Sequence, residues 1–258
     1  MILVVDVGNT NTVVGAMKEG EVLHHWRIST TMRTTDEMGL LLLQLVEVKG
    51  LSATEISGVC VSCVVPSVLY SIEKAARRYF GVHAVVIGKG IKTGMRIRTD
   101  NPREVGADRI VNAVSAYQVC QSAVVVVDFG TATTFDCVSS EGDYVGGVIS
   151  PGFRISAEAL FNRAAKLPKV EVERPERVIG TNTIHSMQSG LYWGYVGLVN
   201  SLASRCKAEL HEQNPHSQIH CVATGGLSNL IGRACDEIDS VDADLTLRGL
   251  WLLFHRNQ

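Results

Sequence analysis

The chain has 258 residues, of which 46% are hydrophobic and 19% are charged, and its formal net charge is −2. This composition is typical of a globular protein with one large domain or two small ones, and it excludes a disordered chain. A surface so close to neutral does not attract nucleic acid or an anionic membrane, so we expect neither as a partner.

Hydrophobic periodicity and turn residues predict the elements of the first half. An apolar segment predicts a buried strand that ends near Asp6, and a strand, a turn at residues 18–21 and a returning strand follow it. Three helices are expected after these strands, at residues 36–48, 67–80 and about 107–120. Thr34 or Thr35 is the expected N-cap of the first helix.

The second half repeats this order. An apolar strand ends near Asp128, and the same succession of strand, turn and strand follows. Four helices are expected in this half, at residues 155–167 (closed by Pro168), 183–213, about 228–235 and 246–256. A strand is expected at residues 218–223, and the charged segment 168–178 is expected to be an exposed connection.

The two halves share an internal repeat. Residues 2–12 read ILVVDVGNTNT and residues 124–134 read VVVVDFGTATT, with Asp128 following Asp6 after 122 residues. A repeat of this length is too long for a solenoid and predicts two similar domains, which we place at residues 1–118 and 119–258. The alternation of strands and helices predicts an α/β fold.

The seven cysteines are scattered along the chain, and their number is odd. Cys60 and Cys63 form one CxxC pair, but on a strand they point to opposite faces, and no second pair completes a zinc site. The apolar run at residues 40–46 is too short to cross a bilayer, and the N-terminus has no basic region of a signal peptide. We therefore expect free thiols and a cytoplasmic location.

The segment 6–13, DVGNTNTV, places a carboxylate and a glycine at the end of a buried strand. Gly8 lets the backbone turn tightly, and the N–H groups and hydroxyls that follow it can surround a phosphate. A carboxylate at Asp6 beside phosphates requires a cation between them, which indicates Mg²⁺ held through water. If this loop occurred only once, a polar hairpin turn would explain it about as well as a phosphate-binding loop does. The second copy at Asp128 favours a nucleotide site, although the chain has no Walker A motif.

This duplicated loop resembles the superfamily of actin, sugar kinases, acetate kinase and the heat-shock chaperone ATPases. The resemblance implies an α/β fold of two tandem ribonuclease-H-like domains of the actin-like ATPase class, with ATP bound in a cleft between them. Thr224, Gly225 and Gly226 follow a predicted strand and resemble the adenosine motif of these proteins. A plain turn between a strand and a helix explains the glycine pair by itself.

Five ordered blocks resemble the type III pantothenate kinase family more specifically. They are residues 6–13 (DVGNTNTV), 101–109 (NPREVGADR), 128–136 (DFGTATTFD), 146–152 (GGVISPG) and 244–250 (DLTLRGL). Thr183 and residues 187–190 match a further block, so the resemblance runs from residue 1 to about 253. It implies transfer of the γ-phosphoryl group of ATP to the primary hydroxyl of pantothenate, the first step towards coenzyme A. The implied cofactors are Mg²⁺ and a monovalent cation, K⁺ or NH₄⁺.

Motif chemistry and this resemblance together define the expected site. The residues expected to bind ATP are Asp6, Val7, Gly8, Asn9, Thr10, Asn11, Thr12, Val13, Gly130, Thr131, Thr133, Gly225 and Gly226. The residues expected to bind the acceptor are Gly106, Ala107, Asp108, Arg109, Thr183 and Thr99. Asp128 is expected to hold the monovalent cation, and Asp6 the Mg²⁺. Thr99 and Asp100 stand where the family often has an aromatic residue, which puts a stacking contact to the acceptor in doubt.

Asp108 is the expected catalytic base, because phosphoryl transfer requires a group that accepts the proton of the hydroxyl. Gly106 and Ala107 beside it leave room for a ligand, and Arg109 presents a planar fork that suits a carboxylate. A structural interpretation is also open: Asp108 stabilises a helix dipole, and Arg109 forms a surface ion pair. Two interpretations of Thr183 are also open: it supplies a hydroxyl to the acceptor site, or it is the N-cap of its helix.

Gly190, Gly194 and Gly197 recur at helical spacing, which predicts close helix packing within one subunit or across a dimer. The family resemblance implies a homodimer. Two other functions are open: a non-catalytic nucleotide-binding regulatory relative, like family members first described as transcription accessory factors, and a kinase of the same superfamily with another acceptor. The intact Asp6, Asp108 and Asp128 argue against the first, and the family blocks argue against the second.

Overall fold

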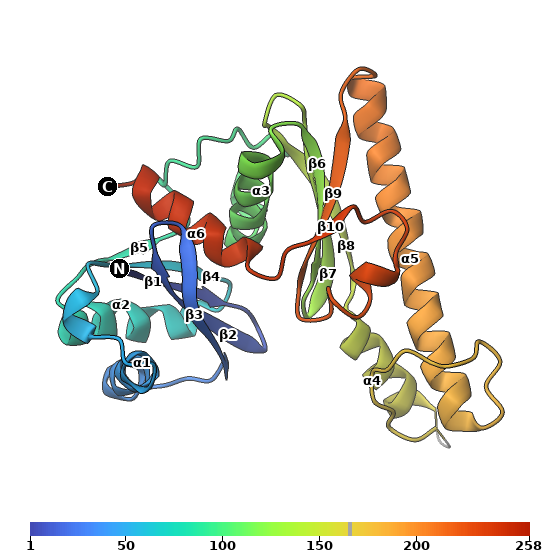
Figure 1. Ribbon diagram of the computed structural model, residues 1–258, viewed down its shortest axis with the longest axis horizontal. Helices are drawn as coiled ribbons and strands as arrows, with labels where there is room; N and C mark the ends of the chain where they lie inside the picture. The colour runs from blue at the N-terminus through green and yellow to red at the C-terminus, as the bar shows by residue number, and fades with distance from the viewer. Residues whose placement is uncertain (165–166) are drawn as a thin grey trace. The chain divides into compact units, whose positions relative to one another are not determined.

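The computed structural model describes residues 1–164 and 167–258, and the chain forms two compact units (Figure 1). The first unit consists of Met1–Met95, Asp100–Ser115 and Asp244–Gln258. The second consists of Arg96–Thr99 and Ala116–Ala243. The domain boundary that the sequence predicts between residues 118 and 119 stays a prediction. The compact units differ from it mainly in the C-terminal segment, which belongs to the first unit.

The first unit is built on a five-stranded sheet with the order β3-β2-β1-β4-β5. Its strands are β1 (Ile2–Val7), β2 (Asn11–Lys18), β3 (Glu21–Ser29), β4 (Gly58–Cys63) and β5 (Ala84–Val86). Its helices are α1 (Thr35–Val48), α2 (Pro66–Phe80), α6 (Leu245–Arg256) and two short 3₁₀ turns, η1 (Ala53–Glu55) and η2 (Pro102–Glu104). α3 (Ala107–Cys120) begins in this unit and ends in the second.

Helix ends in the first unit follow local sequence signals. Thr34 caps α1 in a capping box with Glu37, which confirms the predicted N-cap. Pro66 opens α2, and Gly81 ends it in the left-handed conformation with φ 69°.

The two faces of the first sheet are covered by different helices. Leu3, Val5 and Val7 are buried in a core that includes residues of α1 and α2. The side chain of Val4 points to the other face, where a Cβ at Gly15 would lie 2.9 Å from Val4 Cγ2 and 3.1 Å from Leu247 Cδ1 of α6. Because side chains alternate along a strand, Asp6 points to the same face as Val4. β1 therefore carries a carboxylate at its C-terminal end, on the side of the sheet that α6 covers.

The second unit has a sheet with the order β10-β9-β6-β7-β8. Its strands are β6 (Ala123–Phe129), β7 (Ala132–Val138), β8 (Tyr144–Pro151), β9 (Ile219–Gly225) and β10 (Ser240–Val241). Its other elements are α4 (Phe153–Arg163), α5 (Thr183–Gln213) and η3 (Gly232–Ala234). Each strand of this sheet matches one of the first: β6 corresponds to β1, β7 to β2, β8 to β3, β9 to β4 and β10 to β5. The predicted internal repeat is thus a repeat of topology.

The core of the second unit lies between its sheet and α5. Val125, Val127 and Phe129 of β6 are buried with residues of α5 that include Tyr195 and Val199. The alternation along β6 directs Asp128 to the opposite face of the sheet. The carboxylate of each repeat therefore ends a central strand on the face away from the helices that pack on its apolar residues.

Two predicted helices differ in the structure. α4 ends at Arg163 rather than Leu167, because Ala164 already has an extended backbone, and residues 165–166 of that prediction lie outside the described residues. The helix expected at about residues 228–235 is a set of turns that includes η3, because hydrogen bonds there mostly join residues three apart. The helix predicted at residues 183–213 is confirmed, as is the one at residues 246–256, which starts one residue earlier.

All seven cysteines are free in the structure, as expected for structural thiols. Cys60 and Cys63 lie on β4. No helix within the described residues is both long and apolar enough to cross a membrane.

Candidate functional site

The first candidate loop joins β1 to β2 through Gly8, Asn9 and Thr10. The Gly8 N–H donates to the carbonyl of Asn11 at 3.0 Å, and a Cβ at Gly8 would lie only 3.1 Å from that oxygen. Thr30, which directly follows β3, holds the loop: its hydroxyl donates to the Gly8 carbonyl at 2.7 Å, and its N–H donates to the Thr10 carbonyl at 3.0 Å. Asn9 and Thr10 are exposed at the tip. The result is a fixed polar turn whose tip residues, Asn9 and Thr10, are exposed to solvent.

The second candidate loop joins β6 to β7 and is one residue shorter, with Gly130 and Thr131 between the strands. The Gly130 N–H donates to the carbonyl of Ala132 at 3.1 Å. Gly152, at the end of the predicted GGVISPG block, supports the loop by donating its N–H to the Thr131 carbonyl at 3.1 Å. A Cβ at Gly152 would lie 2.1 Å from that oxygen, so only glycine fits beside the loop.

Asp128 and the glycine motif at Gly225 lie together in the second unit. A Cβ at Gly225 would be 2.4 Å from Asp128 Oδ1 and 2.7 Å from the Phe129 nitrogen, and Gly225 has φ 89°. The Gly226 N–H donates to the Phe129 carbonyl at 3.1 Å. Glycine at position 225 therefore suits both the left-handed backbone of the turn and the space that the Asp128 carboxylate occupies.

Two threonines of the predicted ATP set point inward. Thr12 is 1% exposed, and its hydroxyl lies 2.9 Å from the Thr30 hydroxyl. Thr133 is 1% exposed, and its hydroxyl bonds to the hydroxyl of Tyr195, which also donates to the Pro151 carbonyl at 3.2 Å. Both side chains hold their loops from within. Their expected contacts with ATP stay predictions.

Val7 and Val13 flank the first loop differently. Val7 is 1% exposed and belongs to the α1 and α2 core, so any contact with a nucleotide would come from its backbone. Val13 is half-buried and pairs with Asp6 in the ladder between β1 and β2. The Asp6 carboxylate also acts on Cys63: burial mainly raises the pKa of that thiol, and Asp6 raises it further.

Asp108 lies in the first turn of α3 and is half-buried. Its Oδ1 accepts the N–H of Arg109 at 2.9 Å, and a Cβ at Gly106 would lie 2.5 Å from the same oxygen. Gly106 thus makes room for the Asp108 carboxylate itself. Burial raises the pKa of the Asp108 carboxyl above its ordinary value, and the N–H and guanidinium of Arg109 oppose that shift without cancelling it. A raised pKa is what a carboxylate needs in order to accept a proton near neutral pH.

Thr99 belongs to a short segment that pairs with the start of β8. The N–H of Arg98 donates to the Tyr144 carbonyl at 2.8 Å, and Arg96 Nε lies 3.3 Å from Asp143 Oδ1. The Thr99 hydroxyl is buried and has no hydrogen-bond partner in the described part of the chain. A polar ligand would supply that partner, which is consistent with the expected acceptor contact.

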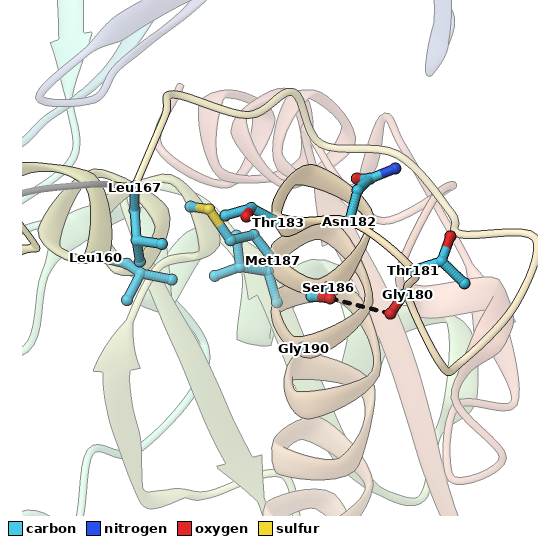
Figure 2. Close-up of a pocket in the computed structure, with 10 residues that line it drawn as sticks. Leu160, Leu167, Gly180, Thr181, Asn182, Thr183, Ser186, Met187 and Gly190 are labelled. Carbon is cyan, nitrogen blue, oxygen red and sulfur yellow. Dashed lines mark hydrogen bonds between the residues drawn. The ribbon is translucent and has the colours of Figure 1, made fainter.

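Thr183 lines a pocket of about 720 Å³ at the start of α5 (Figure 2). Leu160, Leu167 and Met187 form an apolar side of this pocket, and the polar residues of its lining are Thr181, Asn182, Thr183 and Ser186. The N-cap of α5 is Asn182, whose side chain accepts the His185 N–H at 2.9 Å. The capping interpretation of Thr183 is therefore wrong, because Asn182 already occupies the cap, and the Thr183 hydroxyl is exposed at the pocket.

The predicted residues fall into two groups. The first unit contains the β1 loop and, on α3, Asp108 with Arg109; the second contains Asp128, Thr131, Thr183, Gly225 and Thr99. Sequence reasoning missed Thr30, Tyr195 and Ser62, which lie outside the motif blocks. Within the described residues, no three His, Cys, Asp or Glu side chains gather as a metal cluster would. A cation at either loop would therefore be held by one carboxylate together with neutral oxygens.

Comparison with known proteins decides the family. The family model for type III pantothenate kinases matches residues 2–205. The chain belongs to the type III pantothenate kinase family. It is 53% identical to a type III pantothenate kinase from Myxococcus xanthus, over all 258 residues and 99% of the relative.

Solved structures share the fold of this family member at low identity. A protein named as a conserved candidate Baf family transcriptional activator, from Campylobacter jejuni, aligns with TM-score 0.59 and 16% identity, covering 99% of this chain and 98% of its own. The (R)-2-hydroxyglutaryl-CoA dehydratase component A from Acidaminococcus fermentans aligns with TM-score 0.52 and 14% identity, covering 100% and 99%. These likenesses confirm the α/β fold of the actin-like class, and they say nothing about substrate.

Gly225→Ala tests the contact between the glycine motif and Asp128. We expect lower affinity for Mg²⁺-ATP, measured by calorimetric titration, because the new Cβ would displace the Asp128 carboxylate. Gly50→Ala is the matched control, since Gly50 has φ 71° with nothing within 4 Å of its Cβ position. Gly50→Ala should lose roughly 1–2 kcal/mol of stability to the left-handed backbone, and Gly225→Ala should lose more, because its Cβ would also lie 2.7 Å from the Phe129 nitrogen. Equal nucleotide affinity in the two variants would contradict the proposed contact.

The raised pKa of Asp108 predicts how stability depends on pH. A carboxyl that binds its proton more tightly in the folded state does not lower the free energy of unfolding at pH values below its unfolded pKa of about 3.9. The free energy of unfolding falls as the pH rises through the folded pKa, and the loss reaches its full size above that value. Asp108→Asn should therefore match the wild type in unfolding temperature near pH 4 and exceed it near pH 7.5, in calorimetric scans. The exposed Asp236→Asn is the control. A less stable Asp108→Asn at neutral pH would support the helix-dipole interpretation instead.

Proposed function

We propose that this protein transfers the γ-phosphoryl group of ATP to pantothenate, forming 4′-phosphopantothenate, the first step of coenzyme A biosynthesis. The observation that carries this proposal is the 53% identity to a type III pantothenate kinase over the whole chain. The structure supports it through the two phosphate-type loops and a half-buried carboxylate at the start of α3.

Asp108 is proposed as the base that accepts the proton of the pantothenate hydroxyl. Its raised pKa and its fixed position beside Gly106 suit that role. Arg109 is proposed to bind the pantothenate carboxylate through its planar guanidinium. Gly106, Ala107, Thr99 and Thr183 complete the proposed acceptor set, in which Thr99 supplies a hydroxyl in place of an aromatic ring.

The ATP phosphates are proposed to contact Gly8 to Asn11 in the first loop and Gly130 and Thr131 in the second. Asp6 would hold Mg²⁺ through water, and Asp128 would hold K⁺ or NH₄⁺. Single carboxylates with neutral oxygens nearby suit these hard cations. The absence of a side chain at Gly225 leaves Asp128 Oδ1 the space that a Cβ would fill. The bound cations supply neutralisation of phosphate charge during transfer.

We also propose a cytoplasmic homodimer with no nucleic-acid or membrane partner. Gly190, Gly194 and Gly197 are exposed on α5, and nothing lies within 4 Å of their Cβ positions. Packing within the subunit therefore does not account for this glycine face. Exposed apolar side chains in the same unit, Ile155, Leu160 and Phe161 of α4, add surface that a second copy would cover.

The decisive experiment is formation of phosphopantothenate from ATP and pantothenate by the purified protein, with sugars and other hydroxy acids as parallel acceptors. Asp108→Asn should bind ATP normally and lose on the order of 10² to 10⁴ in rate. Asp236→Asn should keep the wild-type rate. Nucleotide binding without turnover on any acceptor would favour the regulatory alternative, and turnover on another acceptor alone would favour the other kinase alternative.

Arg109→Ala separates acceptor binding from ATP binding in the same assay. The KM for pantothenate should rise much more than the KM for ATP, and Arg109→Lys should recover little because an ammonium group lacks the bidentate fork. Equal effects on both KM values would place Arg109 outside the acceptor site.

Gly194→Arg tests the proposed dimer. No atom of the described residues lies within 4 Å of the Cβ position of Gly194, so the variant should fold, yet it should shift from dimer to monomer in sedimentation or light scattering. Gln213→Arg, at the exposed end of the same helix, is the control and should leave the assembly unchanged. A wild-type protein that is monomeric at micromolar concentration would refute the proposal.

A further inference from the structure

Two buried hydroxyls occupy the same place in the two units. Thr224 is 1% exposed and Ser62 is 0% exposed. Neither Thr224 Oγ1 nor Ser62 Oγ has a hydrogen-bond partner within the described part of the chain. Thr224 lies on β9 and Ser62 on β4, and each of these strands is the parallel neighbour of the central strand that carries the loop carboxylate.

Strand register pairs each hydroxyl with a carboxylate. Asp128 is the partner of Thr224, and Asp6 is the partner of Ser62. In-register residues of parallel strands point to the same face of a sheet, and neighbouring strands are only about 4.8 Å apart. Each hydroxyl therefore stands beside the carboxylate of its own unit.

A second observation locates the Asp128 carboxylate. Its Oδ1 lies 2.4 Å from the Cβ position of Gly225, the residue that follows Thr224 on β9. The carboxylate thus extends towards the strand that carries the Thr224 hydroxyl. Both groups meet at the end of β9, beside the exposed turn of Gly130 and Thr131.

A buried hydroxyl without a partner costs free energy, and native proteins rarely keep one. Two of them at equivalent places indicate that something outside the chain supplies the missing partner. A threonine oxygen offers lone pairs to a cation, and a neutral oxygen beside a single carboxylate suits a singly charged ion. No cluster of three acidic, His or Cys side chains competes for this place in the described chain.

We propose that Thr224 is a side-chain ligand of the monovalent cation at Asp128, and that its hydroxyl sets the affinity of this site for K⁺. The inference rests on the proposed cation role of Asp128. It adds a residue of β9, the strand next to β6, that positions the ion. Ser62 stands in the matching place beside Asp6 of the first unit, where no monovalent cation is proposed, and so provides an internal control.

The experiment compares Thr224→Val, Thr224→Ser, Ser62→Ala and Asp128→Asn in the full-length protein with Mg²⁺-ADP. The unfolding temperature is measured as KCl replaces NaCl at constant ionic strength. Wild type, Thr224→Ser and Ser62→Ala should be stabilised by K⁺ over the same concentration range. Thr224→Val should need roughly tenfold more K⁺ or more, as is usual when a group that supports a metal is removed. Without K⁺ it should unfold at the wild-type temperature or above, because a methyl group replaces an unsatisfied hydroxyl.

Two results overturn the inference in distinguishable ways. If the unfolding temperature of Thr224→Val keeps the wild-type dependence on K⁺ while that of Asp128→Asn loses it, Asp128 binds the cation and Thr224 is not a ligand. If neither the wild type nor Asp128→Asn distinguishes K⁺ from Na⁺, the proposed cation role fails, and this inference fails with it. Should valine prevent folding, Thr224→Ala is judged by the same K⁺ titration.

Discussion

The structure depends on a carboxylate placed at the end of a buried central strand, once in each unit. In β1 and β6, apolar residues bury one face against helices, and strand alternation directs Asp6 and Asp128 to the other face. A glycine two residues later turns the chain at once. Burial fixes the strand, so the carboxylate and the turn that follows it have little freedom, and this is the preorganisation that binding a polyphosphate requires.

Each loop is then supported by residues from other strands. Thr30 holds the first loop from just after β3, while Gly152 and Tyr195 hold the second from the end of β8 and from α5. The two loops also differ in length, since the second is one residue shorter. The duplicated topology thus yields two related but unequal sites, in accord with the different cations proposed for them.

The catalytic proposal depends on a different constraint, the partial burial of Asp108 at the start of α3. Gly106 lets the carboxylate approach the backbone, and burial raises its pKa. The same burial opposes stability when the group is charged. A residue that costs stability at neutral pH is more readily explained by a chemical role than by helix capping, since a cap would favour the charged form.

The sequence by itself determined the repeat, the α/β class, most element bounds and the motif residues, because apolar periodicity and glycine positions act locally. It indicated Asp6, Asp108 and Asp128 through short contiguous blocks. Only the tertiary structure decided that Thr133 points inward and that Gly225 lies against Asp128. Strand register alone placed Ser62 and Thr224 beside the two carboxylates. These facts depend on contacts between residues 56 to 97 positions apart, and no local pattern encodes which strands become neighbours.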